Sequence, residues 1–162
     1  MEERIFIALG SNLGDRAGNI REAIRLAEKG GGLAVVRISP LYESEPWGQE
    51  DQPRFVNAVM EARSGLPPGE LLQYLKGIET EMGRQEAERW GPRLIDLDII
   101  FYGSRVVKDE RVEVPHPYAK ERAFVMVPLS DIAPGFIDPL SGAPVSELAE
   151  RTGKEGLRRL EG

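Results

Sequence analysis

The stretch that decides the fold is residues 89–101, RWGPRLIDLDIIF. Its second half, residues 95–101, is apolar and rich in β-branched side chains, which predicts a buried strand. Asp96 and Asp98 interrupt this strand at a spacing of two, so both side chains face the same side of the sheet. Their α-carbons are expected roughly 6.5 Å apart, at about 3.3 Å of rise per residue. Two carboxylates at this spacing can converge on one cation or bridge two.

Two interpretations of the aspartate pair are open. Like charges in an apolar strand repel each other, so the pair is costly unless positive charge lies beside it. That charge could come from salt bridges with Arg89 and Arg93, or from a hard cation with oxygen ligands, most often Mg²⁺. Trp90 lies on the Gly-Pro turn between these two arginines, which can bind phosphate in bidentate fashion. The aspartate pair, the two arginines and the Trp90 ring together favour a site that binds a metal and a nucleotide.

The composition indicates an ordinary water-soluble globular protein. The chain has 162 residues, 41% hydrophobic and 30% charged, so we expect a single domain spanning residues 1–162. A net charge of −6 argues against a nucleic-acid partner. The absence of cysteine excludes disulfides and thiolate chemistry. Lacking a signal peptide or an apolar run of about 20 residues, the chain is predicted to be cytoplasmic, monomeric and without membrane contact.

Alternating strand and helix patterns predict the order β-α-β-β-α-β. Strands are expected at residues 4–9, 33–39, 55–63 and 95–101, and helices after Asp15 and after Pro67-Pro68. Gly10-Ser11-Asn12 is expected to form a turn, and residues 40–53 an irregular segment. A small hairpin is expected over 105–114, a short helical turn near Arg122, and short helical pieces after residue 144. This order is typical of an α+β, ferredoxin-like (split β-α-β) antiparallel sheet packed against helices.

Two further positions suggest ligand contacts. In residues 55–63 the small and apolar side chains at even positions form one face, while Phe55 and Asn57 project from the other. A ring beside an amide suits stacking and edge recognition of a flat heterocycle, although a half-buried Phe with a solvated Asn is equally compatible. His116, between Pro115 and Pro117, is held in a restricted backbone, which leaves a functional and a structural role equally open.

Taken together, the motifs resemble the 6-hydroxymethyl-7,8-dihydropterin pyrophosphokinase family over about residues 5–134. The resemblance is carried by Gly10-Ser11-Asn12-Leu13, by Asp51-Gln52-Pro53 with Phe55 and Asn57, by Arg89-Trp90-Gly91-Pro92-Arg93, by Asp96-Leu97-Asp98-Ile99 and by Val114-Pro115-His116. It implies transfer of pyrophosphate from the co-substrate ATP to the pterin hydroxymethyl group in folate biosynthesis, with AMP as the second product.

The resemblance also implies roles for individual residues. Asp96 and Asp98 would bind two Mg²⁺ ions, and with Arg93 and Arg84 would form the catalytic group. The ATP site would comprise Lys76, Glu79, Arg84, Arg89, Trp90, Arg93, Ile99, Arg111, His116 and Arg122. The pterin site would comprise Ser44, Trp47, Phe55, Asn57, Trp90 and Phe124. Arg84 and Trp90 would belong to a loop that closes over both substrates.

Two other functions are weighed against this one. A non-catalytic ferredoxin-like module that binds a metabolite would not need paired strand carboxylates beside arginines, and its nucleotide binding would be indifferent to Mg²⁺. A kinase that moves only the γ-phosphoryl group would release ADP.

Overall fold

The computed structural model describes residues 3–44, 54–83 and 94–160. Its main sheet is six-stranded and antiparallel, with the order β5-β1-β4-β3-β8 and β2 paired to β4. The elements in chain order are β1 (Ile5–Ser11), α1 (Arg16–Lys29), β2 (Ala34–Ile38), β3 (Tyr42–Ser44), β4 (Phe55–Arg63), α2 (Pro68–Glu81), β5 (Asp96–Tyr102), β6 (Val107–Lys108), β7 (Glu113–Val114), the 3₁₀ helix η1 (Ala119–Glu121), α3 (Ala123–Ile132), α4 (Val145–Thr152) and β8 (Leu157–Arg159).

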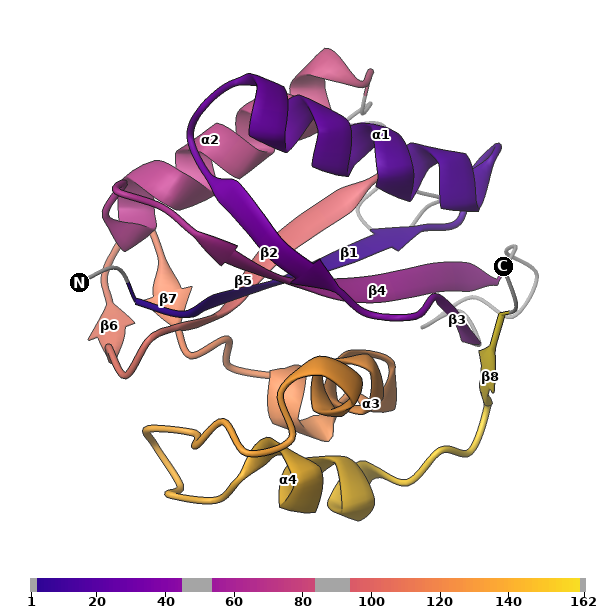
Figure 1. Cartoon of the computed structure of the whole chain (residues 1–162), viewed down its shortest axis with the longest axis vertical. Helices are drawn as coiled ribbons and strands as arrows, with labels where there is room; N and C mark the ends of the chain where they lie inside the picture. Colours follow the sequence, from indigo (N-terminus) through magenta and orange to yellow (C-terminus); the bar gives the residue numbers. More distant parts are fainter. Residues whose placement is uncertain (1–2, 45–53, 84–93, 161–162) are drawn as a thin grey trace.

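The predicted ferredoxin-like fold is confirmed. The units β1-α1-β2 and β4-α2-β5 place their strands in the order β5-β1-β4-β2, which is the split β-α-β arrangement. Helices α1 and α2 cover one face of the sheet, and α3 and α4 cover the other (Figure 1). No helix in the described ranges is long and apolar enough to cross a membrane.

Each face of the sheet has its own apolar core. Toward α1 and α2 the strands contribute residues such as Leu9, Val56 and Leu97. Toward α3 and α4 they contribute residues such as Phe6 and Ile100. Because side chains alternate along a strand, residues next to each other in sequence serve opposite layers.

Local sequence explains where the two long helices begin. Asp15 accepts a hydrogen bond from the Gly18 N–H at 3.1 Å, which satisfies one of the free amide groups at the start of α1. Pro67 precedes α2 and Pro68 is its first residue, where a missing N–H costs no helical hydrogen bond. After α2 the chain turns at Gly83, whose φ of 89° is easily reached only by glycine.

Several expectations are wrong in detail. Gly10 and Ser11 do not form a turn; they continue β1, paired with β4 and, at Gly10, with β5. The expected irregular segment contains the strand β3, and the expected helical tail contains β8, which pairs with β3. The helical turn after Arg122 is a ten-residue helix, α3. The hairpin is confirmed as β6 and β7.

Candidate active site

The site lies on the face of the sheet toward α3, where three neighbouring strands carry polar or very small residues. Gly10 of β1 pairs with Asn57 of β4 on one side and with Asp96 of β5 on the other. One step along the same face, Ala8 pairs with Asp98. Because the central strand has almost no side-chain volume here, it forms a floor between an amide and two carboxylates.

A cavity of about 150 Å³ opens above this floor, which is enough for an aromatic ring. Helix α3 and the segment before it form its far wall. The lining residues are Ala8, Leu9, Gly10, Ser44, Phe55, Asn57, Asp96, Asp98, Ile100, His116, Ala119, Arg122, Phe124 and Val125.

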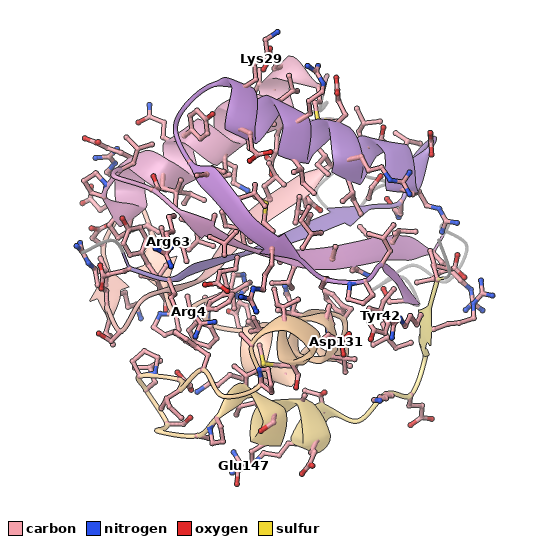
Figure 2. All side chains as sticks on the ribbon, viewed as in Figure 1. Arg4, Lys29, Tyr42, Arg63, Asp131 and Glu147 are labelled. Atoms are coloured by element: carbon pink, nitrogen blue, oxygen red, sulfur yellow. The ribbon has the colours of Figure 1, made fainter. Side chains whose placement is uncertain are left out.

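Asn57 is held in place by the neighbouring strand β3. Its side-chain nitrogen donates to the Ser44 hydroxyl at 2.7 Å, and both residues are buried. Strand β3 is itself fixed to α3, because the Tyr42 hydroxyl donates to Asp131 (Figure 2). Burial and this hydrogen bond raise the pKa of Tyr42 to about 12, so its hydroxyl remains a donor. The amide is therefore a rigid, directional group in an otherwise mainly apolar wall.

Two aromatic rings line the same cavity, Phe55 from β4 and Phe124 from the first turn of α3. The Arg122 guanidinium carbon lies 5.7 Å from the centre of the Phe124 ring. This contact stacks a permanent positive charge against the wall of the cavity. The cavity therefore combines apolar ring faces, one fixed amide and a cationic rim.

His116 is held by backbone contacts on both sides. The backbone N–H of His116 donates to the Ile100 carbonyl at 2.9 Å. The imidazole Nδ1 accepts from the backbone N–H of Tyr118 at 3.1 Å. Burial lowers the pKa of the imidazole, and the nearby Asp98 charge offsets only part of this effect. A neutral ring that accepts at Nδ1 carries its proton at Nε2, so His116 can donate a hydrogen bond from Nε2.

A second cavity of about 290 Å³ adjoins the first and shares Asp98 and His116 with it. Its lining residues are Leu72, Asp98, Ile99, Asp109, Glu110, Arg111, Val112, Glu113, His116 and Pro117. Two of the residues expected at the ATP site, Ile99 and Arg111, meet here. Two ligands occupying these cavities would approach each other at Asp98 and His116.

The donor chemistry of the aspartate pair fits a divalent cation that keeps water and binds phosphate. Asp96 and Asp98 both line the first cavity, as expected from their spacing. Over residues 3–44, 54–83 and 94–160 no group of three or more side chains is arranged as a complete metal site. Mg²⁺ commonly binds through one or two carboxylates and takes its other ligands from water and substrate phosphate oxygens.

The geometry agrees with what comparison with known proteins shows. Residues 6–134 match the family described as 7,8-dihydro-6-hydroxymethylpterin-pyrophosphokinase (HPPK). The chain belongs to this family. The predicted resemblance and the predicted class of enzyme, an ATP-dependent diphosphokinase of folate biosynthesis, are confirmed, and the non-catalytic module is not favoured.

The curated relatives differ in length. A 2-amino-4-hydroxy-6-hydroxymethyldihydropteridine pyrophosphokinase of Pseudomonas aeruginosa is 43% identical over 162 residues, covering 100% of this chain and 99% of the relative. The Aquifex aeolicus enzyme of the same name is 42% identical, covering 88% of each chain. A mitochondrial folate synthesis bifunctional protein of Arabidopsis thaliana is 47% identical over 137 residues, but this chain spans only 24% of its length.

Solved structures support the fold. A Plasmodium falciparum HPPK-DHPS structure with pteroate superimposes with a TM-score of 0.75 at 16% identity, covering 98% of this chain and 46% of that chain. An HPPK-DHPS structure in complex with substrates also superimposes with a TM-score of 0.75, at 14% identity, covering 100% of this chain and 47% of that chain. This HPPK chain therefore corresponds to about half of those chains.

Of the predicted HPPK site residues, one group meets at the two cavities. These residues are Ser44, Phe55, Asn57, Asp96, Asp98, Ile99, Arg111, His116, Arg122 and Phe124. Lys76 and Glu79 line neither cavity and instead contact β5. Trp47, Arg84, Arg89, Trp90 and Arg93 lie outside the described residues.

Sequence reasoning missed Ala8 and Gly10 as the floor of the site. Their small size is the signal that could have revealed them. A Cβ at position 10 would lie 3.2 Å from Asn57 Oδ1 and 3.7 Å from the Phe55 ring. The local sequence around Gly10 instead favours a turn, because its pairing partners Asn57 and Asp96 are more than 40 residues away in sequence.

Proposed function

We propose that the chain transfers pyrophosphate from ATP to the hydroxymethyl group of 6-hydroxymethyl-7,8-dihydropterin, giving the pterin diphosphate and AMP. The observation that carries this proposal is the meeting of an aromatic-walled cavity and a second cavity at Asp98 and His116. A transfer between two substrates requires such adjacency, because most of the catalytic advantage comes from alignment.

The pterin would occupy the first cavity. Phe55 and Phe124 offer ring faces for stacking, and the Asn57 amide offers both a donor and an acceptor to the heterocycle edge. The mechanical support from Ser44 keeps this amide fixed when the ligand is absent. The hydroxymethyl group would then extend toward the aspartate pair.

The nucleotide would occupy the second cavity, with its base near Ile99 and Arg111 and its phosphates toward His116 and Arg122. His116 would donate from Nε2, and Arg122 would supply a permanent charge. Together they would stabilise the negative charge that moves to the leaving AMP oxygens. Arg93 and Arg84, outside the described residues, are proposed to complete this cationic shell.

In the reaction the pterin hydroxyl oxygen bonds to the β-phosphorus while the bond from that atom to the α,β-bridging oxygen breaks. AMP leaves with the bridging oxygen, and the hydroxyl proton is released to solvent with the products. Asp96 and Asp98 are proposed to hold two Mg²⁺ ions, which supply charge neutralisation on the phosphate oxygens when bound. The side chains of the chain itself align the two substrates and exclude water from the space between them.

Product identity tests the proposed reaction. The protein is mixed with ATP, Mg²⁺ and 6-hydroxymethyl-7,8-dihydropterin, and the nucleotides are separated by ion-exchange chromatography. Pterin-dependent AMP is expected. ADP would show transfer of the γ-phosphoryl group alone, and no turnover by folded protein would contradict the proposal.

The number of metal ions is tested separately. Mn²⁺, detected by electron paramagnetic resonance, is titrated into protein saturated with an ATP analogue that has a methylene group between the α- and β-phosphorus atoms. We expect two equivalents bound per chain beyond those held by the free analogue. One equivalent would contradict the two-ion assignment.

A further inference from the structure

Glu79 is a buried carboxylate that lines neither cavity. It lies in α2 with a side chain 2% exposed, and its Oε2 accepts a hydrogen bond from the Leu97 N–H at 2.7 Å. Leu97 is the residue between Asp96 and Asp98. An α2 side chain therefore binds the backbone at the centre of the Asp-Leu-Asp motif.

Lys76, one turn earlier in α2, binds the backbone carbonyl of Leu97. Its Nζ donates to the Leu97 carbonyl at 2.9 Å and to Glu79 Oε2 at 3.0 Å. The same Nζ lies 3.5 Å from Asp98 Oδ1. One ammonium group thus contacts the backbone, the buried carboxylate and a proposed metal ligand.

The position of β5 explains why these contacts matter. Among the residues that the structure describes, β5 is the first strand in the sheet order, and no strand pairs with its outer edge at Leu97. The unpaired N–H and C=O groups of an edge strand need other partners when they are buried. Glu79 and Lys76 supply them, which holds the backbone between the two aspartates in one conformation.

We propose that Glu79 and Lys76 are a pair of positioning residues for the two-carboxylate site, acting through Leu97 and Asp98. This inference rests on the proposed function, because it assumes that Asp96 and Asp98 bind a divalent cation. Glu79 fixes the backbone and adds negative charge next to the site. Lys76 balances the charge of Asp98 and competes with the incoming cation for it.

The two residues therefore have opposite effects on cation binding. Glu79→Gln removes a negative charge and leaves a weaker, neutral amide oxygen to accept from Leu97 and Lys76, so Mn²⁺ binding should weaken about fivefold. Lys76→Gln keeps a hydrogen-bond donor for the Leu97 carbonyl but removes the competing charge, so Mn²⁺ binding should tighten about fivefold. If Glu79 and Lys76 only stabilised the fold, Mn²⁺ binding should weaken in both variants.

Glu61 is the matched control, because it is also a buried carboxylate paired with a cation. Its side chain is 3% exposed and accepts from Arg4 Nε at 2.9 Å and Nη2 at 3.1 Å (Arg4 is labelled in Figure 2). It lies on β4 away from both cavities. Glu61→Gln should lower the melting temperature and leave the Mn²⁺ dissociation constant within about twofold of the original.

The experiment is a Mn²⁺ titration of the original protein and the three variants, followed by electron paramagnetic resonance, with amide hydrogen exchange at Leu97 measured in parallel. We expect opposite shifts for Glu79→Gln and Lys76→Gln, and faster Leu97 exchange in Glu79→Gln. Shifts of the same sign, or dissociation constants within twofold of the original in both variants, would overturn the pair's role. If the original protein bound no Mn²⁺ at all, the metal assignment within the proposed function would fail instead, together with this inference.

Discussion

Three strands of the main sheet, β1, β4 and β5, contribute to both of its faces, and the two faces have different roles. Toward α1 and α2, Leu97, Val56 and Leu9 are almost fully buried in a continuous apolar core. On the opposite face, one residue further along each strand, the first cavity is lined by Asp98, Asn57 and Gly10. The alternation of side chains along a strand thus lets one segment supply stability and chemistry at once. Adjacent residues should therefore show separable effects when changed.

The largest loss of activity is expected from a substitution on β5. Asp98→Asn should reduce pterin-dependent AMP formation at least about a hundredfold, because a charged metal ligand is lost. Its free energy of unfolding should change little, since the repulsion with Asp96 and the half-exposed ion pair with Lys76 are weakened together. Steady-state kinetics and urea denaturation measure the two quantities.

The control for this change is the preceding residue. Leu97→Ala should lower the free energy of unfolding by about 2–5 kcal/mol, the usual cost of truncating a buried leucine. Turnover per folded molecule should stay within about tenfold, because the backbone contacts of Leu97 remain. Near-normal turnover in Asp98→Asn would show that the polar face does not carry the chemistry.

The next largest effect, a loss of pterin affinity, is expected from a substitution on β4. Asn57→Ala should weaken pterin binding about tenfold to a hundredfold, because a buried hydrogen-bonding group is removed from the edge of the heterocycle. Affinity for the methylene ATP analogue should change by less than about twofold. Isothermal titration calorimetry with each ligand separates the two. Equal losses for both ligands would refute the assignment of the first cavity to the pterin.

Val56→Ala is the companion change on the other face of β4. Val56 is 1% exposed within the core toward α1 and α2. Its truncation should lower the free energy of unfolding by about 2 kcal/mol while leaving both ligand affinities within about twofold. Chemical denaturation and the same calorimetric titrations provide the measurement.

A smaller effect is expected on β1. Gly10→Ala would place a Cβ 3.2 Å from Asn57 Oδ1, so the amide must shift by a few tenths of an ångström. We expect pterin affinity to fall about threefold to tenfold with little loss of nucleotide affinity. Unchanged pterin binding would mean that Gly10 is not part of the floor of the site. Leu9→Ala, on the opposite face, should instead cost about 2–5 kcal/mol of stability.

The smallest effect concerns pH. His116 is the only histidine, so its imidazole proton resonance can be followed by NMR without assignment. Its pKa should lie below the ordinary value of 6.5, because burial disfavours the charged ring. Asp98→Asn should lower this pKa further, since the Asp98 charge raises it. A pKa at or above 6.5 would contradict the partly buried, neutral ring.

This pKa shift also gives the sign of one contribution to stability. Because the folded state holds the proton less tightly than the unfolded state, His116 makes its full stabilising contribution above pH 6.5. That contribution is lost as the pH falls through the lowered pKa. Denaturation midpoints of the original protein and His116→Gln, compared between pH 7.5 and pH 5, measure it, and the variant should show the shallower dependence.

Much of this comparison could be predicted from the sequence, because period-two patterning is a local property. The shared faces of Asp96 with Asp98 and of Phe55 with Asn57 follow from spacing alone, and the structure places all four at one cavity. The ferredoxin-like order follows from the same alternation. The resemblance supplied the ligand identities, which spacing could not.

The parts that could not be predicted depend on long-range pairing. Gly10 is a strand residue only because β4 and β5 flank it, whereas its local sequence favours a turn. β3 and β8 are three residues long, and they form because β3 pairs with β4 on one side and with β8 on the other. The resemblance implied that Lys76 and Glu79 contact the nucleotide, which stays a prediction, but it did not indicate their contacts with the edge of β5 or the role proposed for them there. That role depends on how α2 packs, which no local pattern contains.

The two substrates are proposed to lie on either side of the aspartate pair, on the polar face of the sheet. The most direct test is NMR of the complex of the protein with Mn²⁺, the methylene ATP analogue and 6-hydroxymethyl-7,8-dihydropterin, with relaxation measured on protons of both ligands. We expect strong paramagnetic relaxation of the pterin hydroxymethyl protons in the complete complex, and its loss in Asp98→Asn. Hydroxymethyl protons that relax as slowly as in the matching Mg²⁺ complex, with both ligands bound, would contradict it.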